Sequence, residues 1–273
     1  MSRVKTVAAV NDLSGVGRCS LTVAMPVISA MGAQVCPAPT AILSAHTGFK
    51  GIVATDMTEF LGRTLVAWTD MGMLFDCVYT GYLGSPRQAE LILSFLNAQK
   101  QALKIVDPVM GDEGRLYSGV DASMAEAMRA LCRAADVVAP NMTEFSVLAG
   151  EDYSMRPRTR SEIDEMLKRL PSRAAVVTSV PYAGGLANAY RDFSGETGVI
   201  PFEAVDGHYP GTGDLFASVL TGALVAGDAI KSAVARAADF VSRAMALSRG
   251  AGDPNHGVQL EAALPYLLEE QAR

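Results

Sequence analysis

The sequence predicts an α/β protein in which a mostly parallel central sheet is covered by helices on both faces. Three observations support this prediction. Short β-branched runs alternate with longer amphipathic stretches, the runs are almost continuously apolar, and no linker, repeat or low-complexity segment interrupts the 273 residues. Strands that are apolar along their whole length are typical of parallel sheets buried on both faces. We therefore expect one domain over residues 1–273.

Each element follows from its local pattern of apolar residues. Strands are predicted at 6–10, 34–37, 77–80, 104–106, 137–139 and 175–178. Helices are predicted between them at 20–31, 58–69, 86–100, 122–134, 143–148 and 161–170. A hairpin of strands 187–193 and 198–202 follows, with its turn at 194–197, and the remainder is expected to be mostly helical.

Composition excludes several classes of protein. With 49% hydrophobic and 19% charged residues, the chain is not disordered. A net charge of −6 without a Lys or Arg run argues against a nucleic-acid or anionic-membrane surface. No signal peptide and no apolar stretch of about 20 residues are found, so we expect a soluble cytoplasmic protein. The four cysteines (Cys19, Cys36, Cys77 and Cys132) form no C-x-x-C pair and are expected to be buried, reduced thiols.

Polar or glycine-rich segments follow the predicted strands. They are N-D-L-S-G at 11–15, T-G-Y-L-G at 80–84, D-P-V-M-G-D at 107–112, P-N-M-T-E at 140–144 and T-S at 178–179. In open parallel sheets, ligands bind beyond the carboxyl ends of the strands. We therefore expect an active site at this edge of the sheet.

The segment G-T-G-D at 211–214 opens a predicted helix at 215–225. Asp214 could cap this helix, because an acidic residue in the first turn offsets the helix dipole. The flanking glycines Gly211 and Gly213 favour another role, since they let the backbone amides around Thr212 turn toward an anion. A carboxylate beside a bound phosphate is useful when it accepts the proton of an attacking hydroxyl. No Walker A loop is present, and the G-x-G-x-x-G pattern lacks its third glycine at Ser20.

Other candidate residues keep two interpretations. Asn141 and Glu144 have the spacing of a capping box, but they could also organise the water around a magnesium ion. Asp107 and Asp112 flank a turn and could equally serve a divalent cation. His46 is either a surface hydrogen-bonding residue or part of a site.

Together these motifs resemble the ribokinase superfamily, and within it the pyridoxal, pyridoxine and pyridoxamine (vitamin B6) kinases. The resemblance runs nearly end to end. Its carriers are S-A-H-T-G-F at 44–49, T-G-Y-L-G-S at 80–85, D-P-V-M-G-D at 107–112, A-P-N-M-T-E at 139–144, T-S at 178–179 and G-T-G-D-L-F at 211–216. The resemblance implies a single-domain, three-layer ribokinase-like fold and phosphorylation of the 5′-hydroxymethyl group of a B6 vitamer by ATP. It also implies Mg²⁺, often a monovalent cation such as K⁺, and a homodimer.

The resemblance also assigns roles to individual residues. Asp214 would be the catalytic base, with Gly211, Thr212 and Gly213 as its anion hole. The ATP side would comprise Asp112, Thr178, Ser179, Thr212, and Tyr117 on a flap over the phosphates. Asn141 and Glu144 would serve the magnesium and phosphate network. Independently of the resemblance, Asp107 is a candidate second metal-site carboxylate from its position beside the turn. Thr47 and Tyr82 would hold the pyridine ring, with His46 nearby.

One segment departs from the family pattern. Many members carry a Q-S-H type sequence, whose serine contacts the pyridine, where this chain has N-D-L-S-G. Asp12 falls at or near the position of that serine, and Ser14 follows two residues later. A similar D-x-S-G occurs in hydroxymethylpyrimidine kinases, so phosphorylation of a pyrimidine alcohol is the nearest alternative. A non-catalytic pyridoxal phosphate-binding protein is a second alternative, and a nicotinamide-dependent dehydrogenase is disfavoured by the incomplete glycine pattern.

Overall fold

A central β-sheet runs through the protein. The computed structural model describes residues 3–203, 205 and 207–271. Over these residues the sheet has nine strands in the order β11-β10-β9-β8-β5-β4-β1-β2-β3. The parallel strands are β1 (Lys5–Ser14), β2 (Ala33–Leu43), β4 (Cys77–Thr80), β5 (Leu103–Val106), β8 (Val137–Val138) and β9 (Ala174–Tyr182). The mostly parallel sheet expected from the sequence is therefore confirmed.

Antiparallel strands close both edges of the sheet. β3 (Ala54–Asp56) pairs with the end of β2, and the hairpin of β10 (Gly185–Arg191) and β11 (Thr197–Phe202) extends the sheet beyond β9. The predicted hairpin is confirmed, with strands that begin one or two residues earlier than expected. Its turn is closed by Asp192, whose amide donates to the Glu196 carbonyl.

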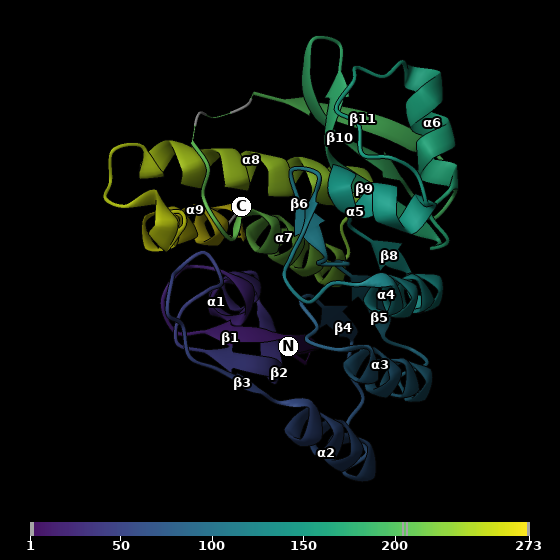
Figure 1. Cartoon of the computed structure of the whole chain (residues 1–273), viewed down its shortest axis with the longest axis vertical. Coiled ribbons are helices and arrows are strands. Elements are labelled where there is room, and N and C mark those ends of the chain that lie inside the picture. The colour runs from purple at the N-terminus through teal and green to yellow at the C-terminus, as the bar shows by residue number, and fades with distance from the viewer. Residues whose placement is uncertain (1–2, 204, 206, 272–273) are drawn as a thin grey trace.

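Helices cover the two faces of the sheet and complete the three layers (Figure 1). One face carries α1 (Ser20–Ala30), α7 (Thr212–Ala226), α8 (Ile230–Ser248) and α9 (Leu260–Gln271). The other carries α2 (Thr58–Asp70), α3 (Pro86–Ala98), α4 (Ala122–Ala134), α5 (Met142–Ala149) and α6 (Arg160–Lys168). None of these helices, within the residues described, combines the length and apolar character needed to cross a bilayer.

The first strand shows why the apolar runs are continuous. Val7 and Ala9 belong to the core under α1 and α7, whereas Ala8 and Val10 belong to the core on the opposite face. Successive side chains of a strand point to opposite faces, so a strand covered on both sides needs apolar residues throughout.

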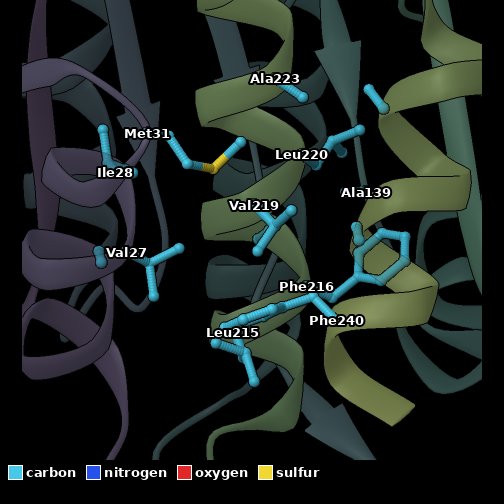
Figure 2. Packing of buried hydrophobic residues seen from close by; sticks show 14 of the residues in the cluster. Val27, Ile28, Met31, Ala139, Leu215, Phe216, Val219, Leu220, Ala223 and Phe240 are labelled. Carbon is cyan, nitrogen blue, oxygen red and sulfur yellow. The ribbon is translucent and has the colours of Figure 1, made fainter. Parts of the chain in front are cut away.

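Close packing between α1 and α7 positions the start of α7. Met31 at the end of α1 lies against α7 near Val219 and Ala223 (Figure 2). A Cβ atom on Gly222 would overlap the Met31 side chain. The two helices therefore pack closely, and the G-T-G-D segment at the start of α7 is held on a rigid support.

Several predicted boundaries were wrong. β1 continues to Ser14, because its polar end pairs with β2 through a bulge between Asn11 and Leu13, so N-D-L-S is strand rather than loop. β9 likewise continues through Thr178 and Ser179 to pair with β10. The short strands β3, β6 (Gly111–Asp112) and β7 (Arg115–Leu116) were not predicted. These strand ends and short strands depend on backbone pairing, which a local apolar pattern does not reveal.

The cysteines agree with the expectation of free, mainly buried thiols. Cys19, Cys77 and Cys132 are buried, and Cys36 is half-buried.

Candidate active site

A cavity of about 760 Å³ opens at the carboxyl edge of the parallel strands. All but one of the residues singled out from the sequence line it. They are Asp12, Ser14, His46, Thr47, Tyr82, Asp107, Asp112, Tyr117, Asn141, Glu144, Thr178, Gly211, Thr212, Gly213 and Asp214. Segments from along the whole chain therefore meet at one place, as the topology of a parallel sheet requires.

Ser179 is the exception. It is absent from the cavity lining, and its backbone amide donates to Asn188 Oδ1 at 3.2 Å. Its φ of 57° marks a local irregularity inside β9. The structure thus places Ser179 inside β9 and outside the cavity lining, and its role on the nucleotide side stays a prediction.

The G-T-G-D segment turns sharply into α7. Gly211 precedes the helix with a φ of 83°, and a Cβ atom on it would overlap the Arg18 carbonyl oxygen. Only glycine suits both conditions. A Cβ atom on Gly213 would meet open space, so packing within the protein does not explain that second glycine.

Asp214 does not cap α7. The helix has no side-chain cap at Gly211, and the Asp214 carboxylate instead accepts hydrogen bonds from Asn11 Nδ2 at 3.2 Å and from the Ser20 amide. Burial raises its pKa to about 6 and Asp12 adds to the rise, against the lowering effect of the two donors. A carboxylate with a pKa near the working pH is suited to accept a proton during a reaction.

Asp12 lies at the β1 bulge and is almost fully buried. It accepts a hydrogen bond from Ser14 Oγ at 2.9 Å and another from the Ser20 hydroxyl. Burial raises the pKa of its carboxyl group, and these hydrogen bonds oppose the rise. Ser14 is wholly buried and orients Asp12, so its hydroxyl is already engaged within the protein.

His46 is committed to the backbone through both ring nitrogens. Nε2 lies 2.7 Å from the Asn255 carbonyl oxygen, and Nδ1 accepts from the Gly48 amide at 3.0 Å. Because a carbonyl only accepts, these partners assign the proton to Nε2. The imidazole therefore offers the cavity its ring surface rather than a free nitrogen. Thr47 beside it is exposed, and Tyr82 is half-buried.

Asn141 and Glu144 form the capping box of α5. Asn141 Oδ1 accepts from the Glu144 amide at 2.9 Å, and Glu144 Oε2 accepts from the Asn141 amide at 2.8 Å. Glu144 Oε1 accepts from the Met110 amide at 3.1 Å. Burial raises the pKa of Glu144 to about 8, but two oxygens that each accept a backbone N–H have the geometry of the ionised form.

The same cap anchors a hairpin over the cavity. β6 and β7 are joined by Glu113 and Gly114, both at positive φ (49° and 76°), as in the tight turns of two-residue hairpins. Asn141 Nδ2 donates to the Gly111 carbonyl and Thr143 Oγ1 accepts from the Gly114 amide, both at 2.8 Å. Residues 112–119, including Tyr117, are exposed. We call residues 111–117 the flap.

The lining of the cavity is strongly acidic. Its carboxylates are Asp12, Asp107, Asp112, Glu113, Glu144 and Asp214. Among the lining residues that the structure describes, Arg115 is the only lysine or arginine. Within the described part of the chain, no group of three or more His, Cys, Asp or Glu residues is arranged to hold a metal ion by itself.

Sequence reasoning missed several residues of the site. Asn11 was noted only as the start of a loop, although a polar residue that ends a fully apolar strand is a usable signal. Arg115 is the one basic residue in the segment 111–119, which is also a signal. Ser20 and Asn255 gave none, because their contacts come from distant segments.

A three-layer fold with a mostly parallel sheet, and a glycine-rich helix start that places an aspartate in the cavity lining, is that of a ribokinase-like kinase. Comparison with known proteins defines the group further. The chain belongs to the phosphomethylpyrimidine kinase family, whose model matches residues 24–259, and to its pyridoxal kinase branch.

Three relatives illustrate this membership. A pyridoxal kinase of Rubrobacter xylanophilus is 30% identical over 267 residues, covering 89% of this chain and 87% of that protein. The structure of pyridoxal kinase from Lactobacillus plantarum is 34% identical, with a TM-score of 0.91 and 98% of both chains covered. A protein of Bacteroides thetaiotaomicron assigned to the phosphomethylpyrimidine kinases, in a crystal form with pyridoxal, is 40% identical. Its TM-score is 0.90, covering 97% of this chain and 96% of that one.

Proposed function

We propose that this protein transfers the γ-phosphoryl group of ATP to the 5′-hydroxymethyl group of a vitamin B6 vitamer. The observation that carries the proposal is Asp214, a carboxylate with a pKa of about 6 beside the glycine-flanked start of α7. The pyridoxal kinase relatives and the relative crystallised with pyridoxal support the choice of substrate.

In the proposed reaction, the vitamer hydroxyl oxygen attacks the γ-phosphorus in line and its proton passes to Asp214. The bond between the γ-phosphorus and the bridging oxygen breaks, and ADP leaves with that electron pair. Backbone N–H groups of Gly211, Thr212 and Gly213 are the candidate donors to the equatorial oxygens, where charge accumulates.

The charge of the cavity supports a divalent cation. Six carboxylates and one arginine would repel a triphosphate unless positive charge is added. Mg²⁺ commonly keeps several waters and binds through one or two carboxylates plus the substrate phosphates, so a preformed protein cage is not required. Asp107 and Glu144 are the residues proposed to hold it, Glu144 through water, since both its oxygens accept backbone N–H groups. The ion would neutralise charge on the phosphates. A monovalent cation such as K⁺ is proposed on the family resemblance.

Other residues of the cavity receive roles consistent with their position. Asp12, Thr47 and Tyr82 are proposed to hold the vitamer ring, with the surface of the His46 ring beside them. Thr178, Asp112 and the flap residue Tyr117 are proposed for the nucleotide side. Closure of the flap over ATP would exclude water and suppress hydrolysis.

A pyrimidine alcohol is the second candidate substrate. The description of the matching family and the carboxylate of Asp12 both favour it, because a carboxylate can accept from an exocyclic amino group. The test is a coupled assay of ADP release with pyridoxal, pyridoxine, pyridoxamine and hydroxymethylpyrimidine, each against an acceptor-free baseline.

The assay separates the candidates. Turnover with a B6 vitamer at the highest kcat/KM is the expected result, and a higher value for the pyrimidine would reassign the substrate. Binding of pyridoxal phosphate without turnover of any alcohol would instead identify a binding protein.

We further propose that residues 1–273 act as one kinase domain, in the cytoplasm and as a homodimer. Exposed apolar side chains such as Met71 and Leu74, both 71% exposed, support an interface with another chain. Light scattering on the purified protein tests the dimer, since a monomer mass at micromolar concentration would contradict it.

A further inference from the structure

Asn11 is a fully buried polar residue that none of the proposed roles uses. It lies on β1 immediately before the bulge, at the carboxyl edge of the sheet. Its Nδ2 donates to Asp214 Oδ1 at 3.2 Å. Its Oδ1 accepts from the Tyr82 amide at 2.8 Å and from the Asp12 amide at 2.9 Å. One side chain thus contacts the candidate base and the backbone of two candidate ring-binding residues.

These contacts determine which way the amide faces. Two backbone N–H groups need an acceptor, and only the oxygen of the Asn11 amide can accept. The NH₂ group must therefore face Asp214, and Asn11 is a donor to that carboxylate. A donor to a carboxylate stabilises its ionised form.

The segment that follows β4 leaves space for the side-chain amide of Asn11. Gly81 follows β4, and a Cβ atom on it would overlap the Asn11 side chain. The Gly81 amide pairs with the Val10 carbonyl at 2.9 Å, so the two segments are fixed side by side. Any larger residue at position 81 would displace Asn11 from the contacts described.

We propose that Asn11 is a positioning residue that aims the Asp214 carboxylate at the acceptor hydroxyl and keeps it ionised. It ties this carboxylate to the segment carrying Tyr82. The inference rests on the proposed role of Asp214 as the base. Asn11 touches neither substrate nor phosphate in this assignment and acts through Asp214.

The decisive variant is Asn11→Asp. It keeps the size of the side chain and an oxygen for the two backbone N–H groups, but it replaces the donor to Asp214 with a second carboxylate. Two adjacent carboxylates resist joint ionisation, so the base should hold its proton to higher pH. The other titratable groups near Asp214 are Asp12, Cys19, Tyr79, Asp107 and Tyr117, and all of them are retained in the variant.

We expect the acid limb of the pH profile of kcat/KM for the vitamer to move upward by at least about one pH unit. The rate should then recover toward the wild-type value at high pH, with an unchanged KM for ATP. The matched control is Asn97→Asp on α3, which makes the same change at an exposed position and should leave the profile unmoved.

A second variant keeps the inference testable if Asn11→Asp does not fold. Gly81→Ala keeps asparagine at position 11, but the added methyl group displaces its side chain. We expect kcat to fall about ten-fold or more without a change in the KM for ATP. A wild-type pH profile in Asn11→Asp, or a wild-type kcat in folded Gly81→Ala, would overturn the positioning role. If Asp214→Asn also retains full activity, the base assignment itself fails, and the two failures are thereby distinguished.

Discussion

The two walls of the cavity differ in how their polar side chains are held. On the wall built by β1, α1 and α7, Asn11, Asp12 and Ser14 are buried and hydrogen-bonded to one another or to Asp214. On the flap, residues 112–117 are exposed, and the flap is anchored by hydrogen bonds between its backbone and the side chains of Asn141 and Thr143. The first wall is suited to fix a reacting atom, and the second is suited to move.

Burial explains why the side chains of the first wall are fixed and those of the flap are not. A buried polar group needs a partner, so each side chain of the first wall is held in one orientation. Exposed side chains of a two-stranded hairpin keep their rotamer freedom until a ligand orders them. Substitutions in the first wall should therefore change the chemical step, whereas substitutions in the flap should change nucleotide binding.

The largest effect is expected for Asp214→Asn. The variant keeps the shape of the side chain but cannot accept the proton, so kcat should fall ~10²–10⁴-fold with near-normal KM for ATP. Asp70→Asn on α2 provides an exposed control. Steady-state kinetics at several Mg²⁺ concentrations measure the effect. Rescue of the rate by Mg²⁺ would indicate a metal ligand, and full activity would exclude the base.

The same substitution should increase stability near neutral pH. Because the folded pKa of Asp214 is about 6, above the usual aspartate value of 3.8, its stabilising contribution is present below about pH 4 and is lost as the pH rises through 6. Asp214→Asn lacks this loss, so we expect it to be more stable than the wild type at pH 7 by about 1–3 kcal/mol. Denaturant titrations at pH 4 and pH 7 test this, and an equal difference at both pH values would contradict it.

Glu144→Gln tests the capping residue of α5 next to the flap. Glutamine has one acceptor oxygen, so either the Met110 or the Asn141 amide would face an NH₂ group. We expect a loss of about 1–3 kcal/mol in stability. If Glu144 also orders magnesium waters, the Mg²⁺ concentration for half-maximal rate should rise several-fold. A lower melting temperature with an unchanged Mg²⁺ requirement would leave Glu144 with the capping role only.

Asp12→Ser tests ring selectivity on the first wall. A hydroxyl in place of the buried carboxylate should change the relative kcat/KM among the vitamers and the pyrimidine by about ten-fold, the size of one altered hydrogen bond to a charged group. The KM for ATP should change little. Equal losses on every alcohol would mean that Asp12 is structural, since it also accepts from Ser14 and Ser20.

The smallest effect is expected on the flap. Arg115 is exposed, and no other arginine or lysine is found among the described residues that line the cavity. Arg115→Gln should raise the KM for MgATP several-fold with little change in kcat, because a partly solvated charge contributes about 1 kcal/mol. Arg63→Gln on α2 is the exposed control. A large loss of kcat instead would place Arg115 with the reacting groups and break the contrast between the walls.

Much of the site could be predicted from the sequence because its motifs are local. Gly211 and Asp214 lie within four consecutive residues at a helix start, and the predicted capping-box spacing of Asn141 and Glu144 is confirmed. The role of Asn141 and Glu144 toward magnesium stays a prediction. The position of Ser179 inside β9 was not predicted, because the end of β9 depends on its pairing with β10.

The sequence by itself determined the layered α/β class, the strands and helices near the motifs, and the set of segments that meet at the cavity. Apolar periodicity and strand-to-helix order are properties of neighbouring residues, so they can be read locally. The tertiary structure alone decided the partners of those polar groups whose contacts lie far away in the sequence. Asn11 and Asp214 are 203 positions apart, and His46 Nε2 donates a hydrogen bond to a carbonyl oxygen 209 positions away. Such partners are chosen by how distant segments pack, because burial requires each polar group to find a donor or acceptor wherever the fold supplies one.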